Sequence, residues 1–182
     1  MEFWDIYDEN KKPTGRTMKR NDWCLKDGEY HLTVLGVVAR PDGTFLITKR
    51  VMTKAWAPGW WEVSGGAAQA GEESYEAVLR EVKEETGLTL TSYKFRGLVT
   101  FINSECESEL MCVFTADEYA GELIECDEGE LCWVDKAMVP NLPAWEGDQV
   151  FLDLLLSGEK RFFSVKLRYE GDRLVEKKIY LY

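Results

Sequence analysis

Three glutamates, Glu81, Glu84 and Glu85, are the residues of this sequence best suited to chemistry. In a helix, spacings of three and four place their carboxylates on one face. Carboxylates held so close together repel one another. A hard divalent cation such as Mg²⁺ or Mn²⁺, which takes oxygen ligands, would remove that repulsion. The spacing therefore predicts a metal-binding helix face.

The flanking residues predict how this helix is positioned. We expect it to run from about Ser74 to Thr86, because Gly87 supplies the left-handed residue that commonly ends a helix. Its other side carries an apolar stripe suited to packing on a sheet: Tyr75, Val78, Leu79 and Val82. Upstream, Ser64-Gly65-Gly66 allows a close backbone approach. The alternative is a solvated helix whose glutamates pair with Arg80 and Lys83.

The stretch from Gly66 to Leu88 resembles the signature of the Nudix hydrolase family, G-x5-E-x7-R-E-U-x-E-E-x-G-U, where U is a bulky aliphatic residue. Every specified position matches: Gly66, Glu72, Arg80, Glu81, Val82, Glu84, Glu85, Gly87 and Leu88. A pattern of this length is far more specific than a lone glycine-rich loop. The resemblance therefore favours the metal-binding interpretation over the solvated helix.

The resemblance implies a metal-ligand set. Gly66 would bind Mg²⁺ or Mn²⁺ through its carbonyl oxygen, and Glu81, Glu84 and Glu85 would bind it through their carboxylates. Arg80 would orient these glutamates rather than touch the substrate.

The resemblance also implies hydrolysis of a nucleoside diphosphate linked to another group. A diphosphate repels nucleophiles, so the reaction needs divalent cations and an activated water. Glu84 or Glu85 is the candidate base. Among the acids of the loop from Glu125 to Glu130, Glu128 is the preferred further catalytic residue. The substrate alternatives include nucleoside triphosphates (oxidised ones among them), ADP-ribose, CDP derivatives and nucleotide sugars.

The N-terminal segments Asp5–Glu9, Gly15-Arg16 and Gly28–His31 look like the isopentenyl diphosphate isomerase-like branch of the family. In the true isomerase, histidines bind metal, and a cysteine with a glutamate moves protons at carbon. Here His31 is the only histidine, and no cysteine lies between Cys24 and Cys106. A pyrophosphohydrolase is therefore favoured, with an isomerase-like enzyme or a non-catalytic nucleotide-binding module as alternatives.

Composition narrows the class of protein. With 33 acidic and 22 basic residues the net charge is −11, which argues against binding a nucleic acid polymer. No apolar run approaches the roughly 20 residues of a membrane helix. The first residues lack the basic segment with which a signal peptide begins. We therefore expect a cytoplasmic protein without membrane contact. Exposed apolar positions in the terminal hairpins are compatible with a homodimer.

The predicted fold is α+β, the Nudix fold, with a mixed β-sheet sandwiched between helices. We expect one domain over residues 1–182, with an N-terminal extension (1–28), a core (29–157) and a C-terminal hairpin (158–182). Apolar alternation predicts a hairpin of His31–Ala39 with Thr44–Arg50, and a second one of Arg161–Tyr169 with Leu174–Tyr182. A helix is expected over Ala144–Leu156.

Four further side chains allow two interpretations. Trp56, Trp60 and Trp61 could stack on a nucleobase, although aromatic residues beside a sheet more often belong to the core. His31 could be a ligand, but a hydrogen-bonded strand residue is the simpler interpretation.

Overall fold

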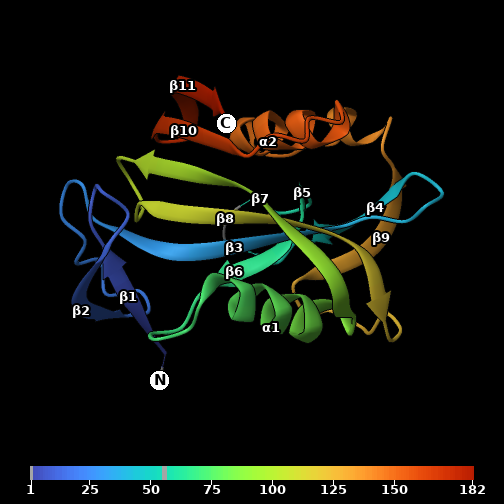
Figure 1. Cartoon of the computed structure of the whole chain (residues 1–182), viewed down its shortest axis with the longest axis horizontal. Coiled ribbons are helices and arrows are strands. Elements are labelled where there is room, and N and C mark those ends of the chain that lie inside the picture. Colours follow the sequence, from blue (N-terminus) through green and yellow to red (C-terminus); the bar gives the residue numbers. More distant parts are fainter. Residues whose placement is uncertain (1, 55–56) are drawn as a thin grey trace.

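The computed structural model describes residues 2–54 and 57–182 (Figure 1). The strands are β1 (Phe3–Tyr7), β2 (Pro13–Lys19), β3 (Tyr30–Val38), β4 (Thr44–Arg50), β5 (Trp61–Glu62), β6 (Ser64–Ala67), β7 (Thr89–Asn103), β8 (Glu109–Ala120), β9 (Gly129–Asp135), β10 (Phe163–Glu170) and β11 (Arg173–Leu181). The α-helices are α1 (Ser74–Thr86) and α2 (Glu146–Leu156), and η1 (Val139–Asn141) is a short 3-10 helix. None of the described helices is long and apolar enough to cross a membrane.

The large sheet lies between the two α-helices, with α1 on one face and α2 on the other (Figure 1). Its strand order is β11-β10-β7-β8-β3-β1-β2, and β6 pairs with β3 off this path. Two neighbouring pairs, β3 with β8 and β7 with β10, are parallel, so the sheet is mixed. Strands β5, β4 and β9 form a second, smaller sheet. The predicted α+β class, with a mixed β-sheet between helices, is confirmed.

Helix α1 packs on the sheet through a narrower stripe than expected. Its bounds, Ser74–Thr86, are those predicted from the sequence, and Gly87 ends it at φ 81°. Val78 and Val82 are fully buried, and a Cβ on Gly36 of β3 would lie 2.5 Å from a Val82 methyl. The helix backbone therefore approaches the sheet closely. Tyr75 was wrongly assigned to this stripe, because its side chain is 47% exposed.

The predicted hairpin of His31–Ala39 with Thr44–Arg50 is wrong. Strand β4 belongs to the smaller sheet, where it pairs with β5 and β9. One isolated bridge, between Ala39 and Phe45, joins the segment His31–Ala39 to β4. The turn was read correctly from Pro41-Asp42-Gly43. The strands diverge after it because β3 is already paired with β8 and β6.

The C-terminal hairpin is part of the large sheet. Strand β10 pairs with β11, as predicted, and also runs parallel to β7. Its first residue, Phe163, is fully buried, and its ring lies over Gly97, where a Cβ would approach to 2.1 Å. Strands β10 and β11 within residues 158–182 are therefore part of the large sheet.

Candidate functional site

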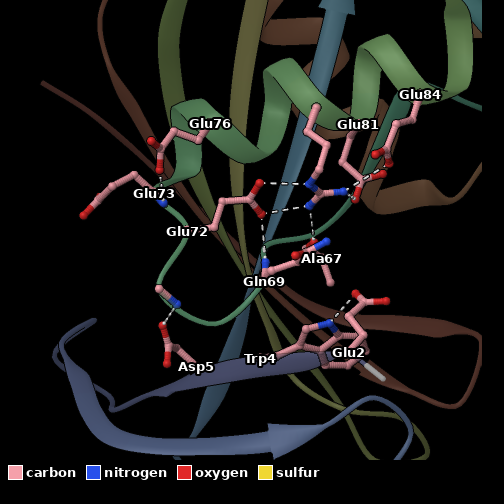
Figure 2. A network of polar contacts seen from close by, with 12 residues as sticks. Glu2, Trp4, Asp5, Ala67, Gln69, Glu72, Glu73, Glu76, Glu81 and Glu84 are labelled. Atoms are coloured by element: carbon pink, nitrogen blue, oxygen red, sulfur yellow. Dashed lines mark hydrogen bonds and ion pairs between the residues drawn. The ribbon is translucent and has the colours of Figure 1, made fainter.

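Arg80, in the middle of α1, is the centre of a polar network, and Figure 2 labels its partners Glu72, Ala67, Glu81 and Glu84. Its guanidinium donates two hydrogen bonds of 2.8 Å to the carboxylate of Glu72 and one of 3.1 Å to the carbonyl oxygen of Ala67. It also donates to Glu81 at 2.7 Å and reaches Glu84 at 3.4 Å. Bidentate pairing with a carboxylate fixes the plane of the guanidinium. Arg80 therefore ties the loop to the helix and fixes the direction of the Glu81 side chain.

The carboxylate of Glu81 lies directly on the backbone of Gly66. A Cβ on Gly66 would lie 2.6 Å from Glu81 Cδ and 2.7 Å from both carboxylate oxygens. Only glycine leaves room for this contact. Strand β6 and helix α1 thus bring the predicted carbonyl ligand and the first predicted carboxylate ligand together.

Glu85 lies deeper in the same site. Its Oε2 accepts a 3.3 Å hydrogen bond from the backbone N–H of Gly65. Burial, with the nearby charge of Glu81 and then of Glu62, raises the pKa of Glu85 to about 8. Burial also raises the pKa of Glu81. The third helix carboxylate, Glu84, is 63% exposed and points toward Arg80 and solvent.

Glu62 is a residue of this site that sequence reasoning missed. It lies on β5 and forms a 2.7 Å ion pair with the buried Arg50. Burial raises the pKa of Glu62, and the positive charge of Arg50 partly offsets that rise. Glu128, the acid preferred from the loop, pairs with Lys54 and contributes to raising the pKa of both Glu62 and Glu85. The only sequence signal for Glu62 was its position just before Ser64-Gly65-Gly66.

The donor set suits a hard divalent cation. Carboxylates and a backbone carbonyl are the ligands that such ions prefer. Within residues 2–54 and 57–182, no three Asp, Glu, His or Cys side chains are gathered closely enough to form a ready-made cation site. Glu81 and Glu85 nevertheless crowd one another in a desolvated place, where a positive charge would lower the free energy of the ionised carboxylates.

A narrow recess adjoins the carboxylates on the side of α2. Trp61, Glu62, Asp148 and Gln149 are among its lining residues, and its volume of about 10 Å³ holds about one water molecule. The Gln149 carbonyl oxygen (Oε1) in it is buried and has no hydrogen-bond partner among the described residues. Burial, followed by the charges of Glu62 and Glu109, raises the pKa of Asp148 to about 7. Glu62 therefore borders both the carboxylate cluster and the recess.

The other side chains singled out from the sequence fall into different places. Trp56 lies outside the described residues. Trp60 packs on Trp145 with ring centroids 5.1 Å apart, whereas Trp61 lines the recess. His31 is 4% exposed and stacks on Trp4 with ring centroids 4.4 Å apart, and burial lowers its pKa to about 4. His31 is thus a neutral strand residue at pH 7.

Glu109 on β8 is a partly buried acid, and its charge contributes to raising the pKa of Asp148. Thr33 Oγ1 donates a 3.0 Å hydrogen bond to Glu109, and His31 Nε2 lies 3.9 Å from its Oε1. Burial raises the pKa of Glu109 from 4.5 to about 7; the Thr33 hydrogen bond opposes the rise, and the charge of Glu107 adds to it.

This pKa predicts the pH dependence of stability. A carboxyl whose pKa is raised by folding favours the folded state when protonated, and that stability is lost as pH rises from 4.5 to about 7. Glu109→Gln removes the titration while keeping an acceptor for Thr33. We expect the variant to gain about 1 to 3 kcal/mol over the parent at pH 8 and little at pH 4.5. Urea unfolding at both pH values measures this difference, and equal gains at both would contradict it.

Comparison with known proteins identifies the family. The model of the NUDIX domain matches residues 29–155. The chain belongs to the Nudix hydrolase family. Among its Nudix relatives, the uncharacterized Nudix hydrolase YvcI of Bacillus subtilis is 38% identical over 106 residues, which cover 56% of this chain and 67% of YvcI.

Two further members of the family match most of the chain. The oxidized purine nucleoside triphosphate hydrolase of Danio rerio is 34% identical over 151 residues, covering 81% of this chain and 93% of that protein. The crystal structure of the MutT protein of Bacillus halodurans superposes with a TM-score of 0.73 at 27% identity, covering 81% of this Nudix chain and 96% of MutT.

Proposed function

We propose that this Nudix protein is a Mg²⁺- or Mn²⁺-dependent pyrophosphohydrolase that cleaves the diphosphate linkage of a nucleoside diphosphate derivative by attack of water on phosphorus. The observation that carries the proposal is the convergence of Glu81 and Glu85 on Gly65-Gly66, with the pKa of both carboxyls raised by burial. When both carboxyls are ionised, their negative charges repel one another, and a bound divalent cation would offset this repulsion.

Each residue then has a defined role. Gly66, Glu81, Glu84 and Glu85 would hold the metal, which when bound neutralises diphosphate charge and lowers the pKa of water. Arg80 fixes Glu81 through its bonds to Glu72 and Ala67.

The base is chosen among the same carboxylates. Glu85 is the better candidate than the exposed Glu84, because a base with a pKa near the working pH takes up a proton most effectively. Glu128, whose charge contributes to raising the pKa of Glu62 and Glu85, would assist by electrostatics or as a further ligand.

The substrate is a small molecule, not a nucleic acid polymer, and we place the reaction in the cytoplasm. The name of the Danio rerio relative supports a nucleoside triphosphate, including an oxidised one, as a first candidate. A homodimer stays a prediction.

The second candidate activity is isomerisation. Isopentenyl-diphosphate isomerases are also among the relatives. Yet His31, the only histidine, is buried against Trp4, and β5–β6, from Trp61 to Ala67, carries no cysteine. The site therefore supports hydrolysis better.

A hydrolysis screen tests the proposal. The protein is incubated with nucleoside triphosphates, oxidised purine nucleoside triphosphates, ADP-ribose, CDP derivatives, nucleotide sugars and isopentenyl diphosphate, each with Mg²⁺, Mn²⁺ or EDTA. We expect a metal-dependent monophosphate product from at least one compound. Conversion of isopentenyl diphosphate without phosphate release would support the isomerase instead, and binding without any turnover would support the non-catalytic module.

A further inference from the structure

Strand β1, in the N-terminal extension, contacts the loop of residues 68–73 that joins β6 to α1. The carbonyl oxygen of Phe3 accepts a 2.7 Å hydrogen bond from the backbone N–H of Ala70. Two residues further along the strand, Asp5 Oδ2 accepts a 2.7 Å hydrogen bond from the N–H of Gly71. The region that the NUDIX model matches begins only after β2, so both acceptors lie outside the matched domain.

Strand β1 is itself fixed to the large sheet. It pairs with β2 on one side and with β3 on the other. The buried ring of Trp4 stacks on His31 of β3 with an interplanar angle of 13°. Ala67, the last residue of β6, packs against the cluster formed by Trp4, Ile6 and Met18. Because side chains packed in this way shift little, β1 is a fixed support for the loop.

The hydrogen bond between Asp5 and Gly71 fixes the residue that directly precedes Glu72. Gly71 has a left-handed backbone, with φ 81°, which glycine adopts without steric cost. Around it the loop forms a closed turn. Glu72 Oε2 accepts a 2.8 Å hydrogen bond from the N–H of Gln69, and the Gln69 carbonyl accepts one of 2.9 Å from the N–H of Glu72. A shift of this turn would therefore move the Glu72 carboxylate with it.

Glu72 connects the turn to the carboxylate site. Its two oxygens accept hydrogen bonds of 2.8 Å from Arg80, and Arg80 donates one of 2.7 Å to Glu81. Figure 2 shows this series of bonds from Asp5, at the bottom, through Glu72 to Glu81 at the top. Groups that orient metal ligands typically change metal affinity or activity by about 10- to 100-fold when they are removed.

We propose that Asp5 is a positioning residue for the carboxylate site. It holds Gly71, and with it the turn from which Glu72 orients Arg80. Arg80 in turn fixes Glu81, which is a metal ligand in the proposed function, so the inference rests on that function. The alternative is that the bond to Gly71 only stabilises the hairpin of β1 and β2. Loss of the bond would then lower the stability of the fold without changing the site.

Asp5→Ala removes the acceptor, and titration with Mn²⁺ followed by electron paramagnetic resonance measures its effect on the site. We expect the dissociation constant for Mn²⁺ to rise about 10-fold, the lower end of the range for groups that orient metal ligands. At a fixed, subsaturating Mn²⁺ concentration, kcat/KM should fall by about the same factor. Asp5→Asn keeps an acceptor oxygen for the Gly71 N–H and should restore most of the Mn²⁺ affinity.

Asp8→Ala is the matched control in the same hairpin. Asp8 Oδ1 accepts hydrogen bonds of 2.8 and 3.0 Å from the N–H groups of Asn10 and Lys12, within the turn between β1 and β2. Its loss should lower the unfolding temperature at least as far as Asp5→Ala does, with Mn²⁺ affinity and turnover unchanged. Equal losses of Mn²⁺ affinity in both variants, or parental affinity in Asp5→Ala, would overturn the proposal.

A measurement in EDTA separates this inference from the proposed function. If the parent neither binds Mn²⁺ nor hydrolyses any compound, the proposed function fails, and the positioning is still tested at Arg80. The Nε–H of Arg80 donates a 2.8 Å hydrogen bond to Glu72, so its resonance in a ¹⁵N–¹H spectrum reports this contact. We expect Asp5→Ala to shift or broaden that resonance and Asp8→Ala to leave it in place. An unchanged Arg80 resonance in Asp5→Ala would refute the role of Asp5.

Discussion

Replacing Glu85 with glutamine is expected to lower kcat by about 10²- to 10⁴-fold, the range that loss of a positioned base produces. The glutamine keeps the shape of the side chain and an oxygen for the Gly65 N–H, so the fold should be retained. Since burial raises the pKa of Glu85 to about 8, the substitution also removes a carboxyl that is costly to ionise. The variant should therefore be as stable as the parent at pH 7, or more stable.

Initial rates with Mg²⁺ and Mn²⁺, together with thermal unfolding, measure both parts of this prediction. Glu118→Gln is a matched control, because it makes the same change at an exposed position of β8 and should keep parental rates. Near-normal turnover of Glu85→Gln would defeat the assignment of Glu85 as ligand and base. A large loss of stability would instead show that the carboxylate has a structural role.

Gly66→Ala should separate the geometry of the site from the stability of the fold. The new methyl carbon would fall 2.6 Å from Glu81 Cδ, and the carboxylate, as the free end of a flexible side chain, must move away. Displacement of a reacting group by about 1 Å costs on the order of 10²-fold in rate. We expect kcat/KM to fall by about that factor while the unfolding temperature changes little.

The control for Gly66→Ala is Ala70→Gly, a change of one methyl in the same loop away from Glu81, which should keep parental activity. Titration with Mn²⁺ followed by electron paramagnetic resonance reports whether metal affinity falls with turnover. Parental kinetics in Gly66→Ala would mean that contact between the glycine and Glu81 is not required for catalysis.

Local patterns predicted the helix α1 well. The predicted bounds of α1, Ser74–Thr86, are correct. The C-terminal end could be predicted because a left-handed glycine, here Gly87, commonly ends a helix. The signature specifies both Gly66 and Glu81 and implies that they bind the same metal, so it predicted that the two residues lie close together. Tyr75 was misplaced because periodicity gives the direction of a face but not how far the partner surface extends.

Pairings between distant segments could not be read in the same way. The turn at Pro41-Asp42-Gly43 indicated a hairpin, yet β4 joined β9, some eighty residues later, because β3 had other partners. Glu62, Glu109 and Asp148 lie on three different elements, and their pKa values are raised by burial that exists only once those elements pack. No short motif in the sequence marks them.

Strand β10 has a consequence for synthesis of the protein. It is inserted beside β7 in the interior of the large sheet, although it follows almost every other element in the sequence. While a ribosome is still translating the residues before Phe163, Gly97 and its neighbours on β7 present an uncovered strand edge. We therefore expect the nascent polypeptide to become protease-resistant only after β10 has emerged from the exit tunnel, and to depend on chaperones until then.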